Sequence, residues 1–462
     1  MATDSTPDPD TLSAIFKAYD VRGVVPDQLD DDLAAAVGNA FVTVTDAAAT
    51  GIVVGHDMRP SSPGMARAFA EGAAETGADV HLIGLASTDE LYFASGKLGL
   101  PGAMFTASHN PAHYNGIKLC RAHAVPVGLD TGLTTIRDRV ASGERTTAAA
   151  AGAIDEVDVL EDYAEYLRKL APVTGRRLRV AVDAGNGMAG HTAPAVLGPL
   201  DLEVLPMYFE LDGTFPNHEA NPIEPENLRD LQAKVTASGA DAGLAFDGDA
   251  DRCFVVDERG EVVSPSVLTA LIAARELRRE PGAKIIHNLI TSKAVPEIVT
   301  ELGGVPVRTR VGHSFIKATM ADSGAIFGGE HSGHFYFRDF WRADSGMLAA
   351  LHVLAALAET DRPLSSLLAD YARFVASGEI NSTVDDQAGV LSRVEDAFRD
   401  REEAEVDHLD GLTVTAPRWW FNVRPSNTEP LLRLNVEADD EATMVAVRDE
   451  ALGIIRASGP GS

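Results

Sequence analysis

A serine and a run of aspartates stand far apart in this sequence, and their residue types together point to phosphate chemistry. Ser108 lies in the segment 106–111 (TASHNP), directly after an apolar stretch. The segment 247–252 (DGDADR) places three aspartates at alternate positions beside an arginine. A serine that carries a phosphoryl group and oxygen ligands for a hard cation are the components of phosphoryl transfer. We expect the two segments to meet at an interface between domains, where small-molecule sites tend to form.

The aspartate segment has the composition of a metal site. Asp247, Asp249 and Asp251 can direct their oxygens at one cation, because Gly248 lets the backbone turn between them. Hard carboxylate oxygens suit Mg²⁺, which prefers a few carboxylates together with phosphate or water. An EF-hand is excluded, because the sixth position of such a loop would be Arg252, where glycine is required. A structural acidic turn is the alternative, although packing carboxylates without a cation is costly.

The serine also has a plainer interpretation, since Ser-His-Asn-Pro is a good turn sequence. No G-x-S-x-G motif surrounds Ser108, so acyl transfer is not favoured. Downstream, Lys118 lies on the segment 116–119, which we expect to be a strand leaving the loop. An ammonium there would bind phosphate or take part in proton transfer; otherwise Lys118 is a surface lysine.

Two further polar segments have the composition of ligand-binding loops. In the segment 328–334 (GGEHSGH), paired glycines allow close backbone approach, and Glu330 and Ser332 suit adjacent sugar hydroxyls. Its histidines lack the further ligands of a zinc site, and a tight glycine turn is the alternative. The segment 424–429 (RPSNTE) combines a guanidinium, hydroxyls and an amide, as a phosphate cradle would, with Arg433 as a second cation. A hairpin loop is the plainer interpretation.

Two smaller clusters carry less information. His313 and Lys317 are four residues apart, and so share one face if a helix starts there. Tyr19 and Arg22 lie in a short polar segment near the N-terminus. A structural histidine and an incidental surface arginine are the alternatives at these positions.

The elements that must position these residues alternate between strand and helix patterns. The expected strands are 52–54, 80–83 and 103–106, then 179–183 and 242–246, then 284–288 and 325–327. Helical patterns such as 89–98 separate them, which predicts mostly parallel sheets covered by helices. An apolar strand runs directly into a polar loop after Phe105, Phe246 and Phe327. Because ligands bind beyond the carboxyl ends of strands in such sheets, we expect three similar α/β domains with one functional loop each.

The C-terminal part has a different pattern, typical of a smaller α+β domain. Strands are expected at 419–423 and 431–438, and a helix closes the chain. In the second strand Leu432, Leu434 and Val436 share one face, and Arg433, Asn435 and Glu437 share the other. The acidic stretch 395–405 is expected to be a solvated helix surface. The predicted domains are I (11–150), II (155–260), III (261–370) and IV (375–457).

Composition limits the possible functions. The chain has 462 residues and a formal net charge of −30, a length that favours roughly two to four domains. So acidic a surface repels nucleic acids and anionic membranes, and a phosphate substrate would need a local basic cluster.

The sequence also bears on location. No apolar signal stands at the N-terminus, and the most apolar stretch, 349–358, is short enough to be a buried helix. Cys120 and Cys253 do not form a disulfide framework, which fits a reduced cytoplasm.

At these segments the chain resembles the α-D-phosphohexomutase family, and within it the phosphomannomutase/phosphoglucomutase group. The motifs stand in the family's order: TASHNP at 106–111, DGDADR at 247–252, GEHSGH at 329–334 and RPSNTEP at 424–430. The resemblance covers nearly the whole chain. It implies three α/β domains and a smaller C-terminal one, arranged around a central cleft.

The resemblance implies roles residue by residue. Ser108 corresponds to a serine that carries a phosphoryl group, and the three aspartates to Mg²⁺ ligands that share the ion with a phosphoserine oxygen. Lys118 and His313 are implied in proton transfer, and Arg252 in catalysis. The implied contacts are Glu330 and Ser332 to sugar hydroxyls, and Arg424, Ser426, Asn427 and Thr428 to the phosphate that is not transferred. The other residues implied to line the cleft are Tyr19, Arg22, Lys293, His334 and Arg433.

The implied reaction moves phosphate between C6 and C1 of a hexose through a 1,6-bisphosphate. Mannose phosphate is the expected substrate, with glucose also accepted. The residue at position 331 differs between groups of the family, so His331 leaves a phosphoglucosamine mutase as the alternative. A metal-dependent sugar phosphatase and a non-catalytic sugar-phosphate sensor are the more distant alternatives. We expect a cytoplasmic monomer or homodimer that binds neither nucleic acid nor membrane.

Overall fold

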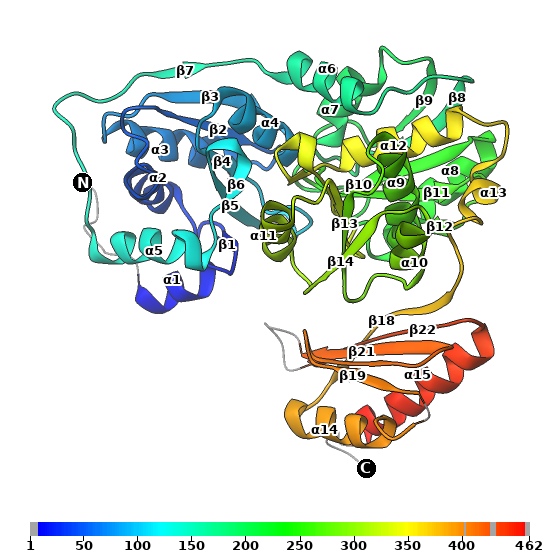
Figure 1. Ribbon diagram of the computed structural model, residues 1–462. Coiled ribbons are helices and arrows are strands. Elements are labelled where there is room, and N and C mark those ends of the chain that lie inside the picture. The colour runs from blue at the N-terminus through cyan, green and yellow to red at the C-terminus, as the bar shows by residue number, and fades with distance from the viewer. Residues whose placement is uncertain (1–7, 402, 426–430, 458–462) are drawn as a thin grey trace.

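The computed structural model describes residues 8–401, 403–425 and 431–457, with the backbone alone at His313 and Ser314. The chain forms three α/β units and a smaller α+β unit, which confirms the expected fold (Figure 1). We refer to them as unit I (8–156), unit II (160–263), unit III (265–368) and unit IV (375–457).

Unit I is built on a mixed sheet with the strand order β1-β5-β4-β2-β3-β7, and β6 also pairs with β5. Its strands are β1 (Asp20–Val24), β2 (Ile52–His56), β3 (Val80–Leu85), β4 (Gly102–Phe105), β5 (Tyr114–Arg121), β6 (Val125–Pro126) and β7 (Ile154–Glu156). Its helices are α1 (Pro9–Ile15), α2 (Asp31–Thr45), α3 (Ser62–Ala74), α4 (Thr88–Leu98) and α5 (Leu133–Ser142). Strand β7 pairs with β3 and extends this sheet beyond residue 150.

Unit II has the strand order β12-β11-β10-β8-β9. Its elements are β8 (Leu178–Asp183), β9 (Leu202–Met207), β10 (Ala242–Phe246), β11 (Cys253–Asp257), β12 (Val262–Val263), α6 (Leu160–Leu170), α7 (Ala189–Leu197) and α8 (Arg229–Ser238). Strand β12 pairs with β11 and extends this sheet beyond residue 260.

Unit III repeats the arrangement with the strand order β14-β13-β15-β16-β17. Its strands are β13 (Lys284–Asn288), β14 (Val305–Thr309), β15 (Phe327–Gly329), β16 (Phe335–Phe337) and β17 (Ala343–Asp344). Its helices are α9 (Pro265–Arg279), α10 (Ala294–Glu301), α11 (His313–Ser323), α12 (Gly346–Ala358) and α13 (Leu364–Leu368). Strand β15 begins at Phe327, where we expected the strand to end, because Gly328 and Gly329 continue the pairing with β13.

The three α/β units share one topology, and it places their functional loops at equivalent positions. In each sheet a central strand pairs in parallel with two neighbours, and one of these then pairs with an antiparallel strand. The turns into that antiparallel strand join β4 to β5, β10 to β11 and β15 to β16. They contain the serine, aspartate and glycine-rich segments, so the predicted strand-to-loop pattern is confirmed.

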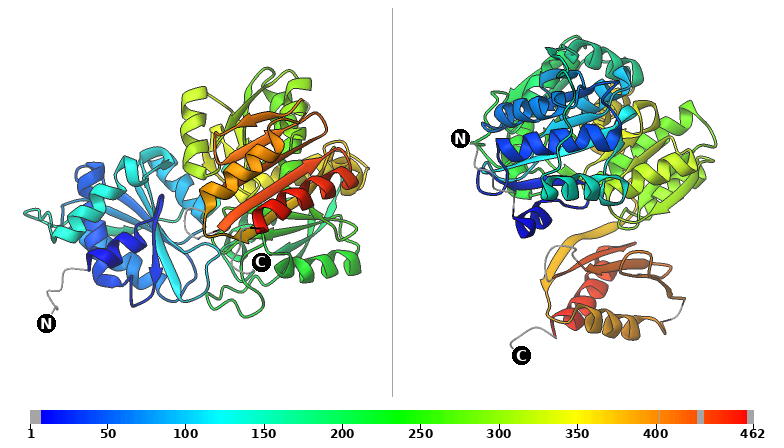
Figure 2. Two further views of the ribbon diagram at one scale, coloured as in Figure 1. Left: turned by 90° about the horizontal axis from the view of Figure 1, so that it is seen from below. Right: turned by 90° about the vertical axis from the view of Figure 1, so that its left-hand side faces the viewer.

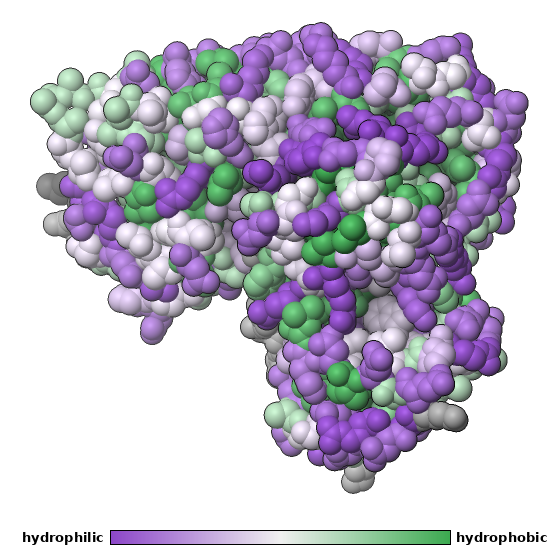
Figure 3. All heavy atoms as spheres, viewed as in Figure 1, coloured by the Kyte–Doolittle hydropathy of each residue, from purple (hydrophilic) through white to green (hydrophobic). Residues whose placement is uncertain are grey.

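Units I to III are joined by a common hydrophobic core, whereas unit IV has its own. The largest apolar cluster contains residues of all three α/β units, among them Leu91, Val182 and Leu351. Helix α12 is buried over its whole length, as its apolar sequence predicts. Among the described residues, no helix combines the length and apolar character needed to cross a bilayer. The face in Figure 3 is mostly hydrophilic with scattered hydrophobic residues.

Unit IV consists of a sheet with the order β18-β22-β21-β20-β19 and two helices against one face. Its elements are β18 (Val375–Thr383), β19 (Glu405–Asp407), β20 (Leu412–Thr415), β21 (Trp419–Pro425), β22 (Leu431–Ala438), α14 (Gln387–Phe398) and α15 (Glu441–Arg456). Helix α14 ends at Phe398, so the acidic stretch 395–405 is helical only in its first part. Figures 1 and 2 show unit IV projecting from the other units, with its helices on the far side of the sheet.

Candidate active site

Ser108 lies in the turn between β4 and β5 and directly contacts the aspartate loop of unit II. Its hydroxyl donates a hydrogen bond to Oδ2 of Asp247 at 2.8 Å. The residue is buried, and its backbone adopts a left-handed conformation with φ of +48°, which is uncommon for a residue other than glycine. The Ser108 amide donates to Oγ1 of Thr106 at 2.9 Å, which helps to fix this turn. The expected meeting of the two segments across a domain interface is therefore observed.

The aspartate loop joins β10 to β11 and is buried against unit I. Asp247, Asp249 and Asp251 each contribute a carboxylate oxygen to a group whose atoms lie within 4.8 Å of one another. A Cβ atom on Gly248 would come within 2.4 Å of the Ser108 carbonyl oxygen, so glycine is required for the two loops to approach. Oδ1 of Asp249 and Oδ1 of Asp251 are buried without a hydrogen-bond partner among the described residues. These clustered, unpartnered hard oxygens fit a divalent cation such as Mg²⁺.

Lys118 offsets part of the negative charge of this loop. It projects from β5, and its Nζ lies 2.6 Å from carboxylate oxygens of both Asp249 and Asp251. Against burial, which lowers it, the two carboxylates hold the pKa of Lys118 well above its usual value. For Asp249, burial acts to raise the pKa of the carboxyl group, but the nearby Lys118 ammonium lowers this pKa overall. Lys118 is thus held as a cation inside the site.

Arg252 ties the serine to the aspartates. Its Nε donates to Oδ2 of Asp247 at 2.8 Å, and its Nη2 lies 3.3 Å from the Ser108 hydroxyl. The same guanidinium contacts Nδ1 of His109, which the sequence analysis did not assign to the site. Burial, then the Arg252 charge, lowers the pKa of His109 well below its usual value. Burial raises the pKa of Asp247 to about 7, although Arg252 acts against this.

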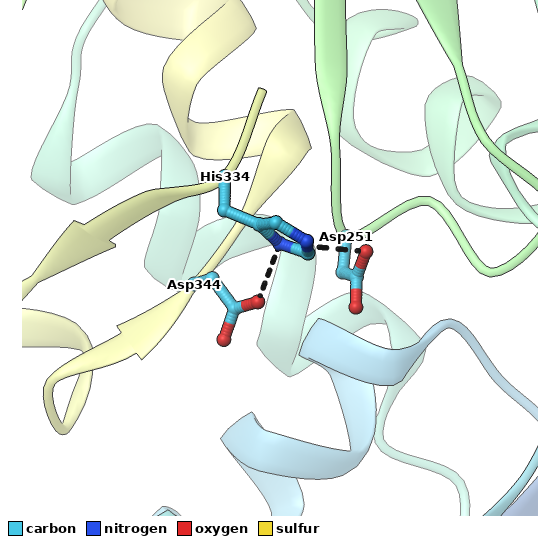
Figure 4. Close-up of side chains that lie close together, drawn as sticks. All are labelled: Asp251, His334 and Asp344. Carbon is cyan, nitrogen blue, oxygen red and sulfur yellow. Dashed lines mark hydrogen bonds and ion pairs between the residues drawn. The ribbon is translucent and has the colours of Figure 1, made fainter. Parts of the chain in front are cut away.

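The glycine-rich loop of unit III reaches the same site. A β-bridge joins Arg252 to His334, so the aspartate and glycine-rich loops are paired through their backbones. Nδ1 of His334 lies 2.9 Å from Oδ2 of Asp344 and 3.8 Å from Oδ1 of Asp251 (Figure 4). Against the effect of burial, Asp251 and Asp344 raise the pKa of His334. Asp344 in turn pairs with Lys317 at 2.8 Å. The sequence analysis noted Lys317 beside His313 without giving it a role, and it did not identify Asp344.

Glu330 is held rigidly at the base of this loop. It is buried, and its carboxylate accepts hydrogen bonds from the Gly312 amide at 3.1 Å, the Asn288 side chain at 3.4 Å and the Tyr336 hydroxyl at 2.7 Å. Ser332, in contrast, is partly exposed in the turn. The Gly312 contact links Glu330 to the start of α11, which begins at His313, so the condition for His313 and Lys317 to share a helical face is met. The side chain of His313 lies outside the described residues.

The arginines expected to bind phosphate lie on the sheet of unit IV. Arg424 and Arg433 are directly opposite each other on β21 and β22. Both pair with Glu379 of β18, at 3.0 Å and 3.2 Å, a residue that the sequence analysis did not identify. They share the face that is turned toward units I–III (Figure 1), since α14 and α15 cover the opposite one. Ser426, Asn427 and Thr428 lie outside the described residues.

The remaining expected cleft residues occupy different places. Arg22 contacts the serine loop, donating to the Asn110 side chain at 2.6 Å. Tyr19 borders an apolar cavity of about 510 Å³ between unit I and α11. Lys293 lies at the junction of units III and IV, where its Nζ donates to the Pro417 carbonyl at 3.2 Å. The structure therefore brings Arg22 to the serine loop and ties Lys293 to unit IV.

One residue beneath the serine loop was missed by the sequence analysis. Arg59 follows β2, and its guanidinium donates to backbone carbonyls of the loop, including that of Ser108. The available signal was its position: the polar segment 57–62 follows the carboxyl end of a buried strand, as the assigned loops do. The residue types in the segment 57–62 did not by themselves suggest a ligand-binding loop.

Comparison with known proteins assigns each unit to a family. Family models described as "Phosphoglucomutase/phosphomannomutase, alpha/beta/alpha domain I", "domain II" and "domain III" match residues 13–147, 161–260 and 265–374. The model for the C-terminal domain of the same family matches residues 379–454.

Individual proteins are similar over almost the whole chain. A protein from Xanthomonas campestris pv. campestris named "Phosphohexose mutases" is 41% identical, over 96% of this chain and 98% of its own length. An Escherichia coli phosphomannomutase is 40% identical, over 96% of this chain and 100% of its own. The crystal structure of a phosphoglucomutase/phosphomannomutase family protein from Burkholderia thailandensis superposes with a TM-score of 0.89 at 33% identity, covering 97% of this chain and 98% of that one.

Proposed function

The chain belongs to the phosphoglucomutase/phosphomannomutase family and is a phosphohexomutase, and we propose that it moves phosphate between C6 and C1 of a hexose through a phosphoserine at Ser108. One observation carries this assignment of the serine. Its hydroxyl lies 2.8 Å from Asp247, at the edge of a buried set of carboxylates suited to a divalent cation. Asp247, Asp249, Asp251 and an oxygen of the phosphoserine would hold Mg²⁺, which when bound offsets negative charge on the phosphoryl oxygens.

In the first half-reaction, a hydroxyl oxygen of a hexose monophosphate attacks the phosphorus of phosphorylated Ser108. The new O–P bond forms on the sugar, the Oγ–P bond breaks, and its electron pair stays on Oγ. Arg252, 3.3 Å from Oγ, stabilises the negative charge that develops there. A hexose 1,6-bisphosphate results.

The second half-reaction reverses these steps at the other end of the sugar. Oγ of Ser108 attacks the phosphorus of the other phosphate, the sugar O–P bond breaks, and the sugar oxygen recovers a proton. The same group therefore takes a proton from one hydroxyl and returns it to the other, so the protons balance. His334 and His313 are our candidates, whereas the tight pairing of Lys118 with two carboxylates favours charge compensation for that residue.

Binding must tolerate both orientations of the bisphosphate. We assign the phosphate that is not transferred to Arg424, Arg433, Ser426, Asn427 and Thr428, since guanidinium and hydroxyl groups hold phosphate regardless of the sugar carbon that carries it. Glu330 and Ser332 would then hold a pair of hydroxyls common to both orientations. Three hydrogen-bond donors hold the Glu330 carboxylate in position for this proposed contact with the sugar. Tyr19, Arg22, Lys293 and His334 complete the proposed cleft.

Mannose phosphate is the substrate that we propose, with glucose phosphate second, because an Escherichia coli relative at 40% identity is named a phosphomannomutase. The assay compares mannose, glucose and glucosamine 1-phosphates side by side. A preference for glucosamine 1-phosphate would favour the phosphoglucosamine mutase alternative. Stoichiometric release of inorganic phosphate would instead indicate a phosphatase.

Replacement of the serine tests the central assignment. Ser108→Ala should lose essentially all turnover of mannose 1-phosphate even with the bisphosphate supplied, because no group remains to accept the phosphoryl. Ser142→Ala, at an exposed serine at the end of α5, is the matched control and should retain full activity. Full turnover by Ser108→Ala would disprove the phosphoserine role.

A further inference from the structure

Arg59 is buried beneath the loop that carries Ser108, and all the N–H donors of its guanidinium are used, most of them on this loop. Its side chain is fully inaccessible to solvent. Nη1 donates to the carbonyl oxygens of Pro111 at 2.9 Å and Tyr114 at 3.0 Å, and Nη2 to those of Asn110 at 2.7 Å and Ser108 at 2.9 Å. Nε donates to Asp57 at 3.2 Å. A guanidinium has five N–H donors in a rigid fork, and here they face five acceptors.

Two residues of unit II lie against Arg59. The ring of Phe215 lies 5.2 Å from the guanidinium carbon of Arg59. A Cβ atom on Gly213 would come within 2.6 Å of the Arg59 Cα, so the backbone of unit II is in close contact with this residue. The Ser108 carbonyl is likewise enclosed between Arg59 and Gly248 of the aspartate loop. Arg59 therefore connects the serine loop to the unit that supplies the carboxylates.

The serine loop requires such a support for two physical reasons. A non-glycine residue at positive φ is unfavourable and persists only where its surroundings fix it, and Ser108 has φ of +48°. In addition, the loop turns several carbonyl oxygens toward the protein interior, and a buried carbonyl without a donor is unfavourable. Arg59 satisfies these carbonyls together, and at Ser108 it binds the backbone carbonyl and not the hydroxyl.

We infer that Arg59 is a positioning residue for phosphoryl transfer, which holds the serine loop so that phosphorylated Ser108 stays aligned with the aspartates. This inference rests on the proposed function of Ser108. Arg59 acts through the backbone and does not touch the reacting atoms. The four carbonyls that it binds belong to residues 108–114, so its loss should affect this loop more than the core of unit I.

The test replaces the guanidinium of Arg59 with a group that keeps the positive charge. Arg59→Lys offers three donors without the planar geometry, and cannot reach the four carbonyls together. We expect kcat for mannose 1-phosphate to fall about 10²-fold, as a shift of roughly 1 Å at a reacting group produces, with little change in KM. Amide hydrogen exchange should accelerate in 106–114 and stay unchanged in β2. Phe215→Leu keeps the hydrogen bonds and removes the stacked ring, so it should act in the same direction more weakly.

Arg176→Lys is the matched control, because Arg176 also donates to a backbone carbonyl and a carboxylate but lies away from the loop. It should leave kcat unchanged. An Arg59→Lys enzyme with normal kcat, or with normal exchange protection of 106–114, would overturn the positioning role. Turnover retained by Ser108→Ala would instead remove the proposed function, so the two failures are distinguishable. If Arg59→Lys does not fold, kcat and exchange in Phe215→Leu decide the question.

Discussion

At the scale of single residues, the charges around Ser108 compensate one another through direct contacts. Arg252 neutralises Asp247, and Lys118 is shared between Asp249 and Asp251. All these carboxylates are buried, where an unpaired charge is strongly unfavourable. Lys118 contacts the Oδ2 atoms of the two carboxylates whose Oδ1 atoms are left without a hydrogen-bond partner in the described part of the chain, so Lys118 and a divalent cation should compete for the same negative charge.

This competition gives a signed prediction for Lys118→Met, which keeps the length of the side chain and removes the charge. The affinity for Mn²⁺, measured by calorimetry, should rise because Asp249 and Asp251 are released. At the same time kcat should fall about 10²–10³-fold, because a cation close to the proposed phosphoserine is lost.

Lys97→Met, which removes an exposed ion pair with Asp162, serves as the control and should change neither quantity. Weaker metal binding in Lys118→Met would contradict the competition that we describe.

At the scale of elements, the first turn of α4 supports the aspartate loop. Oγ1 of Thr88 donates to Asp249 at 2.5 Å, and Asp89 accepts from Tyr163 of unit II at 2.8 Å and Ser345 of unit III at 2.6 Å. The turn is closed by a capping box in which Glu90 is the third residue. This helix start therefore contacts units II and III, and the burial that this requires raises the pKa of Asp89 to about 6.

Glu90 makes the stability of this turn dependent on pH. Burial, with the Asp89 charge as a second cause, raises the pKa of Glu90 from its ordinary value of 4.5 to about 8. Between these values the folded state keeps a proton that the unfolded state has lost, so the free energy of unfolding decreases as pH rises. Glu90→Gln keeps the capping box without this titration, so its stability relative to the unmodified enzyme should increase from pH 5 to pH 8, by on the order of 1–3 kcal/mol.

Denaturant unfolding at both pH values measures this difference. The exposed substitution Glu71→Gln is the control, and its effect should be the same at both. A stability difference for Glu90→Gln that does not vary with pH would show that the buried carboxyl is not retained in its protonated form.

At the scale of the whole molecule, the proposed substrate contacts are divided between two bodies. Units I to III share a core and hold the serine, aspartate and glycine-rich loops together. Unit IV has its own core and carries Arg424 and Arg433 on the face turned toward them (Figures 1 and 2). A hexose bisphosphate that contacts both bodies should draw unit IV inward and exclude water from the reaction.

Small-angle X-ray scattering tests this closure. Saturating glucose 1,6-bisphosphate should reduce the radius of gyration of the Ser108→Ala enzyme, which cannot turn the ligand over. Arg424→Ala, introduced into the same enzyme, should abolish the reduction, because it removes the proposed phosphate contact on unit IV. Arg418→Ala, at an exposed arginine of unit IV that pairs with Asp439 and Asp440, should retain it. An unchanged radius of gyration in the Ser108→Ala enzyme at saturation would contradict closure.

The sequence by itself determined the fold class, the alternating faces of β22 and the segments that carry the chemistry. These features depend on local properties: the period of apolar residues, glycine in turns, and ligand-type side chains at short spacing. The start of β15 and the edge strands β7 and β12 were harder to predict from the sequence, because pairing with a neighbouring strand decides where such strands begin and end.

Only the tertiary structure decided which charges meet. Lys118 and Asp249 are 131 residues apart, and Ser108 and Asp247 are 139 apart, so packing of units I and II brings each pair together. The residue types around Arg59 and Glu379 do not reveal that Arg59 supports the serine loop or that Glu379 pairs with two arginines. Each is an ordinary turn or strand residue in the sequence, and its role comes from the backbone or charge that the fold places against it. A sequence pattern records what a side chain offers, whereas burial and contact across the units determine what it does.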